Sequence, residues 1–201
     1  MIRMIYLIGL LLACAPLQAQ HETLFGDFST FGAFGGPILE FSSINGQMTA
    51  DVGGGGALIL DGFFIGGYGM GTEFPSITLE REIDGQLRDI DYNIRLGQGG
   101  LWLGYVHNAP KLIHVFSSLK IGWGKAELKH DEFGLPSDRI FALTPELGVE
   151  VNISSFFKLG FTAGYRLVNG INRLPTLGND DFSSPVGALT FRFGGFGDYD
   201  D

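Results

Sequence analysis

The chain has 201 residues with 32 glycines, 13% aromatic residues and only 17% charged residues, and its formal net charge is −9. A negative net charge argues against a nucleic-acid binder, because contacts with phosphates depend on a basic surface. One cysteine excludes a disulfide scaffold and a multi-thiolate metal site, and no run of ~20 apolar residues is present to form a transmembrane helix.

The first 19 residues have the three parts of a secretory signal peptide. Arg3 supplies the positive charge, residues 5–13 form the apolar segment, and Ala19 stands at the expected cleavage position. An alternative is a lipobox over residues 11–14, in which Cys14 is acylated after cleavage. Both interpretations predict export. The predicted organisation is a signal peptide over 1–19, an N-terminal segment over 20–29, one barrel domain over 30–196 and an acidic tail over 197–201.

The barrel domain is predicted from segments in which apolar residues alternate with polar residues or glycine, the pattern of two-faced β-strands. Turn-forming pairs such as Asn45-Gly46 and Asp61-Gly62 separate the segments, and no segment has the apolar spacing of a helix. The eight predicted strands cover residues 30–43, 47–60, 63–80, 87–106, 112–128, 139–153, 156–168 and 184–196.

The two faces of these strands favour a membrane barrel over a soluble one. One face is apolar, and Leu147, Val149, Phe161, Leu189 and Phe191 on it are predicted to face lipid. The other face carries glycine and a balanced set of charges, which suits a narrow interior because buried charges must be paired. Alternation predicts a lumen charge network of Glu40, Asp51, Asp91, Arg95, Lys120, Glu146, Glu150, Lys158, Arg166 and Arg192.

Connection lengths predict how the barrel is oriented. Tight turns at Asp61-Gly62, 108–110 and Ser154-Ser155 are expected in the periplasm, and the last of these is expected to bring Glu150 nearly opposite Lys158. Longer polar segments at 73–86, 129–138 and 169–182 are expected outside. The third and fourth strands are long and should project as a hairpin ending near 83–86, whose backbone edges are available to a surface protein partner.

The opening Gly35-Gly36-Pro37 and the final strand 189–193 resemble those of small eight-stranded outer-membrane β-barrels, similar to the family of outer-membrane proteins A and X. The resemblance implies an all-β, eight-stranded antiparallel up-and-down transmembrane β-barrel in the cell outer membrane. It also implies contact with membrane lipid and insertion by the barrel assembly machinery, for which a final strand with a terminal aromatic residue is the signal. The chain departs from the pattern by continuing past Phe193 through Phe196, so either phenylalanine fits that terminal role.

Several motifs resemble phosphate-binding or calcium-binding sites, but each lacks a residue that such a site requires. The glycine clusters at 53–56 and 66–71 have no phosphate-loop register, and Asp89–Asn93 is not followed by the glycine and glutamate of a calcium loop. Four aromatic residues are predicted to form interfacial girdles rather than a ligand-stacking set. They are Trp102, Tyr105, Trp123 and Tyr165.

The histidines, serines and glutamates of the chain raise the possibility of a hydrolytic triad. His114 and Ser117 point to opposite faces of one strand, and no Gly-x-Ser-x-Gly motif occurs. The residues that would supply it are His107, His114, His130, Ser117, Ser118, Glu146 and Glu150.

The sequence therefore predicts a non-catalytic integral outer-membrane barrel with a structural, interaction or adhesion role and a lumen plugged by paired charges. No cofactor, metal or nucleic-acid partner is predicted. Two alternatives remain open: a lipid-modifying enzyme of the lipid A deacylase or acyltransferase type, and a soluble periplasmic barrel that binds an apolar ligand.

Overall fold

The computed structural model describes residues 30–73, 76–83, 86–129 and 134–197. The predicted signal peptide, the N-terminal segment and all but the first residue of the acidic tail lie outside the described residues. No helix in this part of the chain is long and apolar enough to cross a membrane.

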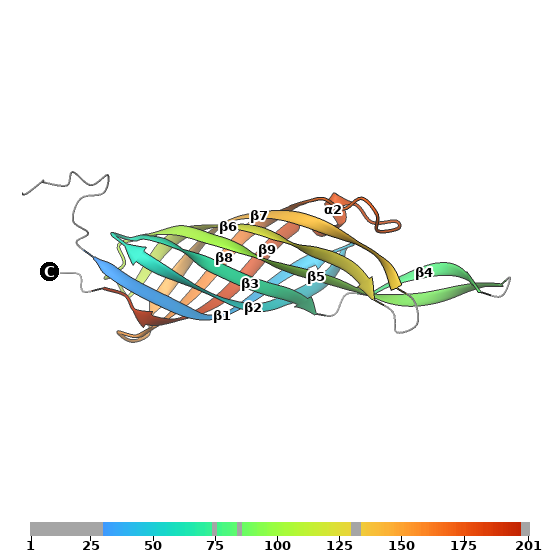
Figure 1. The fold of residues 1–201 in the computed structure, drawn as a ribbon. Helices are drawn as coiled ribbons and strands as arrows, with labels where there is room; N and C mark the ends of the chain where they lie inside the picture. The colour runs from blue at the N-terminus through green and yellow to red at the C-terminus, as the bar shows by residue number, and fades with distance from the viewer. Residues whose placement is uncertain (1–29, 74–75, 84–85, 130–133, 198–201) are drawn as a thin grey trace, which may run out of the picture.

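The described chain forms nine strands and one short helix (Figure 1). They are β1 (Phe31–Ile44), β2 (Gln47–Leu60), β3 (Phe63–Glu73), β4 (Ser76–Ile83), β5 (Gln86–His107), β6 (Ile113–Lys129), β7 (Gly134–Asn152), β8 (Phe157–Asn169), α2 (Asn179–Phe182) and β9 (Ser184–Gly195).

The strands close into a barrel of eight positions. Each strand pairs antiparallel with its neighbours, and β1 closes the ring by pairing with both β2 and β9. β3 and β4 occupy one position, because both pair with β5 along its length. This confirms the predicted eight-stranded antiparallel up-and-down barrel.

The two ends of the barrel differ. We call the end with residues 30 and 197 the turn end, because its connections at 61–62, 108–112 and 153–156 are short. At the opposite end, the hairpin end, β4 and the start of β5 project beyond the other strands, as predicted (Figure 1).

Local sequence explains the tight connections. Asn45 and Gly46 have φ angles of 50° and 74°, and Asp61 and Gly62 have 49° and 84°. Two consecutive positive φ angles define the hairpin turn that Asn-Gly and Asp-Gly pairs favour. The segment 134–138 was predicted as a loop, which is wrong: all of it belongs to β7, which begins at Gly134, paired with Lys129, because the β6–β7 ladder continues past the glycine and proline there.

The glycine clusters serve close packing of strands. A Cβ atom on Gly53 would lie 2.0 Å from the carbonyl oxygen of Gly69, and one on Gly66 would lie 1.9 Å from that of Gly56. Only glycine fits such an approach of two backbones. The clusters therefore shape the β2–β3 wall.

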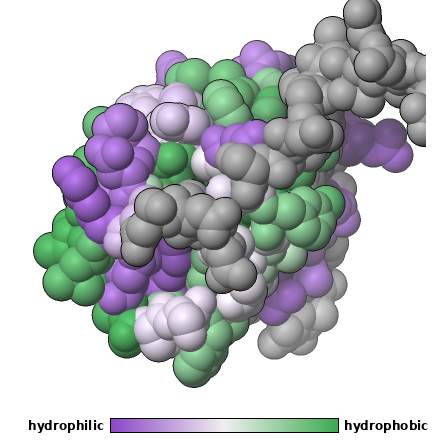
Figure 2. Space-filling view, turned by 90° about the vertical axis from the view of Figure 1, so that its left-hand side faces the viewer, coloured by the Kyte–Doolittle hydropathy of each residue, from purple (hydrophilic) through white to green (hydrophobic). Residues whose placement is uncertain are grey.

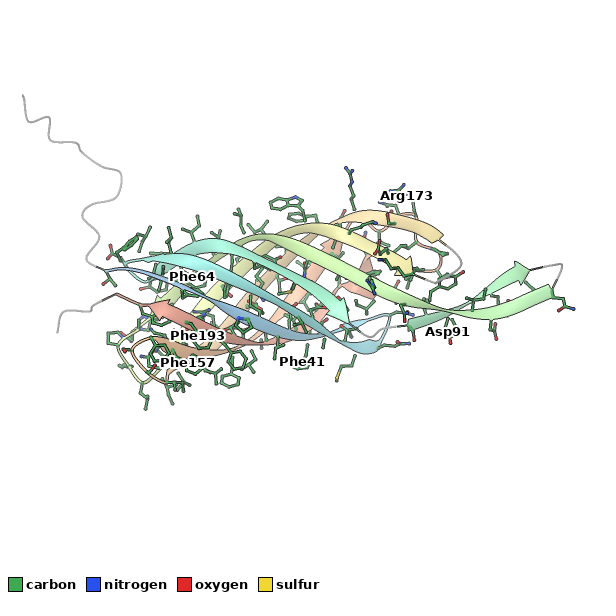
Figure 3. All side chains as sticks on the ribbon, turned by 60° about the horizontal axis from the view of Figure 1, so that its bottom comes forward. Phe41, Phe64, Asp91, Phe157, Arg173 and Phe193 are labelled. Atoms are coloured by element: carbon green, nitrogen blue, oxygen red, sulfur yellow. The ribbon has the colours of Figure 1, made fainter. Side chains whose placement is uncertain are left out.

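Most of the barrel is apolar outside. Leu147, Val149 and Phe161 are exposed, and Leu189 and Phe191 face the same way with partial exposure. Phe157 and Phe193 stack on each other outside the wall, 4.7 Å between ring centroids (Figure 3). Figure 2 looks onto the turn end and shows hydrophobic side chains at several places on the rim, with hydrophilic ones between them.

Candidate functional site

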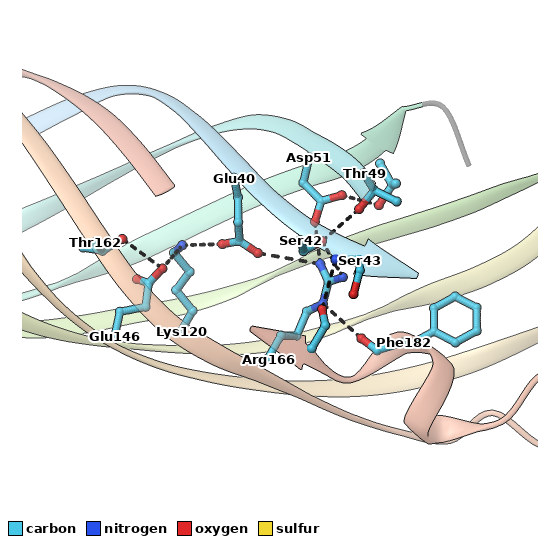
Figure 4. Close-up of polar contacts among 12 residues, drawn as sticks. Glu40, Ser42, Ser43, Thr49, Asp51, Lys120, Glu146, Thr162, Arg166 and Phe182 are labelled. Atoms are coloured by element: carbon cyan, nitrogen blue, oxygen red, sulfur yellow. Dashed lines mark hydrogen bonds and ion pairs between the residues drawn. The ribbon is translucent and has the colours of Figure 1, made fainter. Parts of the chain in front are cut away.

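The middle of the barrel interior holds a network of buried ion pairs (Figure 4). Lys120 Nζ lies 2.8 Å from Glu40 Oε2 and 2.9 Å from Glu146 Oε1. Arg166 pairs with Asp51, lies 3.6 Å from Glu40, and donates to Ser42 Oγ at 2.8 Å. These side chains come from five strands, so the network ties opposite walls of the barrel together.

A second group of charges lies nearer the turn end and centres on Glu150. Its carboxylate is 2.7 Å from Arg192 Nη1, 3.0 Å from His114 Nε2 and 3.7 Å from Lys158 Nζ. Three basic side chains therefore share one carboxylate, and Arg192 makes the shortest contact with it.

Aromatic rings enclose the guanidinium of Arg192. Its Cζ atom is 4.3 Å from the ring centroid of Phe116, 4.7 Å from Phe34, and 5.1 Å from both Phe64 and Trp102. These distances are those of cation–π contacts. The rings belong to an apolar cluster that fills the interior around this end of the barrel.

The structure brings eight of the ten predicted network residues together inside the barrel. Asp91 and Arg95 are the exceptions: both are exposed on the outer face of β5, and the prediction for them is wrong. Figure 3 labels Asp91 on the projecting part of the strand. Both residues lie near the hairpin end, where β5 turns Tyr92, Ile94 and Leu96 inward. In this part of the barrel the interior is apolar and the outer face is charged, so the inside–outside pattern of the rest is reversed.

Two further predictions need correction. Trp102 is buried in the lumen at 2% exposure rather than in a girdle, whereas Tyr105, Trp123 and Tyr165 are exposed. Glu150 is paired with Gly160, and Lys158 with Asn152, because five residues, 153–157, separate the last paired positions and shift the register. Glu150 and Lys158 are thus diagonal neighbours.

A capping segment closes the hairpin end and was not recognised in the sequence. Residues 170–183, which include α2, bring Phe182 into the apolar cluster inside this end. The Phe182 carbonyl accepts a hydrogen bond from Arg166 Nε at 3.3 Å, and Asn45 N–H donates to the Asp181 carbonyl at 2.7 Å. The signal available in the sequence was the apolar spacing of Leu174, Leu177 and Phe182 within a polar stretch.

Asp138 on β7 anchors this capping segment. Its Oδ2 atom accepts hydrogen bonds from the backbone N–H groups of Asn172, Arg173 and Leu174 at 2.9, 2.7 and 3.1 Å. Burial acts to raise the pKa of Asp138, but the hydrogen bonds from Arg173 and Asn172 outweigh it and hold the pKa below its ordinary value.

Replacing Asp138 by alanine is expected to release the capping segment. Trypsin cleavage after Arg173 should become about tenfold faster or more, because hydrogen bonds to a charged group contribute ~1.5–3 kcal/mol each. Asp138→Asn, which keeps an acceptor, should give a smaller increase. Because the folded pKa is lowered, the anchor is complete above pH 3.8 and weakens only as the pH falls below that value. Unchanged cleavage in the alanine variant would contradict the anchoring role.

The candidate triad residues that the structure describes are not arranged for catalysis. His114 has both ring nitrogens occupied, Nδ1 by the Lys111 carbonyl at 2.9 Å and Nε2 by Glu150. Ser118 Oγ donates to Glu146 at 2.8 Å, and Ser117 lies on the outer face. His107 is exposed, and His130 lies outside the described residues. Within the described ranges, no cluster of three or more His, Cys, Asp or Glu is placed to hold a metal ion.

Comparison with known proteins identifies the fold. No protein-family model and no curated protein matches the chain. Among solved structures, Neisserial surface protein A aligns with a TM-score of 0.55 and 9% identity over 83% of this chain and 96% of that one. Ail, the attachment invasion locus protein of Yersinia pestis, aligns with a TM-score of 0.48 and 14% identity over 82% and 96%. The chain has the fold of small eight-stranded outer-membrane β-barrels.

Proposed function

We propose that this protein is an integral outer-membrane barrel with a non-catalytic structural or interaction role and a closed lumen. The observation that carries the proposal is the order of residues along the outer faces of β5, β6 and β7. The register aligns Leu101, Ile121 and Leu143 in one row, Gly99, Trp123 and Phe141 in the next, and Gly97, Lys125 and Arg139 in the third. Aliphatic, then aromatic, then charged rows match the order of environments from bilayer core to water.

The lumen contents support a closed barrel. An eight-stranded barrel has an interior only wide enough to be filled by side chains. Here an aromatic cluster at the turn end, ion pairs in the middle and an apolar cluster under the capping segment follow one another along the axis.

The final strand fits the proposed route of insertion. Phe193 is exposed on the outer face of β9, whereas Phe196 follows the strand and is buried, with its ring centroid 4.2 Å from Lys158 Nζ. We assign the terminal aromatic position read by the barrel assembly machinery to Phe193.

The projecting hairpin is the proposed contact for a protein partner. Within the described ranges, β5 pairs with β6 only from Asn93 onward, so residues 86–92 have β4 as their single neighbour. Backbone edges of this kind accept an added strand.

Planar-bilayer recording tests the closed lumen. The pure protein is expected to show no steady single-channel steps, because no continuous water path crosses a barrel filled in this way. Heat-modifiable migration on gels, measured on the same preparation, verifies that the recorded protein is a folded barrel. Large and stable steps would overturn the closed lumen and favour a pore.

A further inference from the structure

A group of cations lies on the outer face at the hairpin end, although the chain as a whole has a net charge of −9. We call it the basic patch: Arg95 on β5, Lys125 and Lys129 on β6, and Arg139 on β7. All four side chains are exposed, and their strands are adjacent in the ladder.

The basic patch has more positive charge than its own carboxylate balances. Glu127 lies 2.6 Å from Lys125 Nζ and 3.1 Å from Lys129 Nζ, and the hydrogen bond from Lys125 leads the contacts that hold the pKa of Glu127 below its usual value. Among the described residues, neither Arg95 nor Arg139 has an ion-pair partner. Asp91, farther along the hairpin, accepts a hydrogen bond from Thr78 at 2.6 Å.

The ladder register sets Arg95 opposite Glu127, which is favourable, but it leaves Lys125 and Arg139 as an unfavourable pair in the absence of an anion. Lys125 lies directly opposite Arg139 across the β6–β7 pair. Like charges in directly opposed positions destabilise a sheet. An anion between them would convert this repulsion into attraction.

The surface beside the patch indicates what kind of anion fits. Trp123 and Phe141, two residues from Lys125 and Arg139 along their strands, pack with 5.9 Å between ring centroids. Two residues along a strand span about 6.6 Å. A lipid whose acyl chains lie on the rows of Ile121 and Trp123 therefore places its headgroup phosphate at the level of the basic patch.

We propose that the basic patch binds the phosphate of an anionic membrane lipid whose chains pack on the aromatic and aliphatic rows below it. The proposal rests on the proposed membrane location. It adds a specific lipid contact on one side of the barrel, at the hairpin-end boundary of the bilayer.

Tryptophan fluorescence gives a local probe of this contact. The chain has two tryptophans, of which Trp102 is enclosed in the lumen and Trp123 is 56% exposed beside the patch. The barrel is reconstituted in phosphatidylcholine bilayers that contain either brominated phosphatidylglycerol or brominated phosphatidylcholine. Quenching of Trp123 at equal mole fractions then measures the preference for the anionic headgroup.

We expect brominated phosphatidylglycerol to quench at a lower mole fraction than brominated phosphatidylcholine. The double variant K125Q/R139Q should lower this preference about thirtyfold, since each of the two cations near a membrane surface contributes ~1 kcal/mol. Glu127→Gln should raise the preference, and Lys111→Gln, which removes a cation at the turn end, should leave it unchanged.

The outcomes separate this inference from the membrane location. Equal quenching by the two lipids, or an undiminished preference in the double variant, would overturn the lipid site while leaving the barrel in the bilayer. Absence of quenching by either lipid would instead overturn the membrane location. Loss of the preference on adding inorganic phosphate, but not sodium chloride of equal ionic strength, would assign the patch to free anions and also overturn the lipid site.

Discussion

Replacing Glu150 by alanine is expected to lower the free energy of unfolding in lipid by about 3–5 kcal/mol. The side chain of Glu150 is 2% exposed and is the carboxylate that Arg192, His114 and Lys158 share. Its removal leaves buried cations without a counter-charge, and this costs more than the loss of the pair itself. Urea unfolding of the barrel in lipid vesicles, followed by heat-modifiable migration, measures the change.

Double variants identify which cation depends most on Glu150. E150A/R192M should recover much of the loss, because Arg192 makes the shortest contact and methionine suits the four surrounding aromatic rings. E150A/K158M should recover less, since Lys158 Nζ is 3.7 Å away. A loss below about 1 kcal/mol in Glu150→Ala would mean that water reaches this part of the lumen.

Replacing Val149 by arginine is expected to cost about 2–4 kcal/mol in the same unfolding experiment. Val149 is 42% exposed on the outer face of β7, opposite Val115 and Phe161. An arginine there must enter the hydrocarbon of the proposed bilayer.

A matched control lies on the same face of the same strand. Ser137 is beyond the aromatic row, opposite Glu127, so Ser137→Arg should cost only ~0–1 kcal/mol, as expected near the interface. Equal effects at the two positions would show that the outer face of β7 does not cross a boundary between lipid and water.

The sequence predicted most of the strands because each depends on local information. Alternation fixes which residues share a face, and pairs such as Asn45-Gly46 mark where the chain reverses. The ladder between Lys129 and Gly134 was missed because pairing between strands outweighs the local preference of glycine and proline for turns.

The prediction of the interior network is correct where the polar face of the strands points into the barrel. It is wrong near the hairpin end, where the polar face points outward. Alternation correctly placed Asp91 and Arg95 on the same face of β5. It could not predict whether that face points into or out of the barrel. That depends on the environment: beyond the aromatic row, charges turn outward and Ile94 and Leu96 turn inward. The capping segment was missed for a related reason, since its anchor on Asp138 joins residues 34 to 36 positions apart.

Spin-label accessibility along β7 most directly tests whether the barrel is embedded in a membrane with its apolar face toward lipid. A chain beginning at Gln20 contains no cysteine, so single cysteines can be introduced and labelled at the odd positions from 137 to 149 and at 140, 142 and 144. In bilayers, we expect oxygen to reach the odd positions from Phe141 to Val149, and a water-soluble nickel chelate to reach Ser137 and Arg139. The inward-facing positions Ile140, Ala142 and Thr144 should be protected from both reagents. Nickel accessibility at Leu147 and Val149 equal to that at Ser137 would contradict a membrane-embedded barrel.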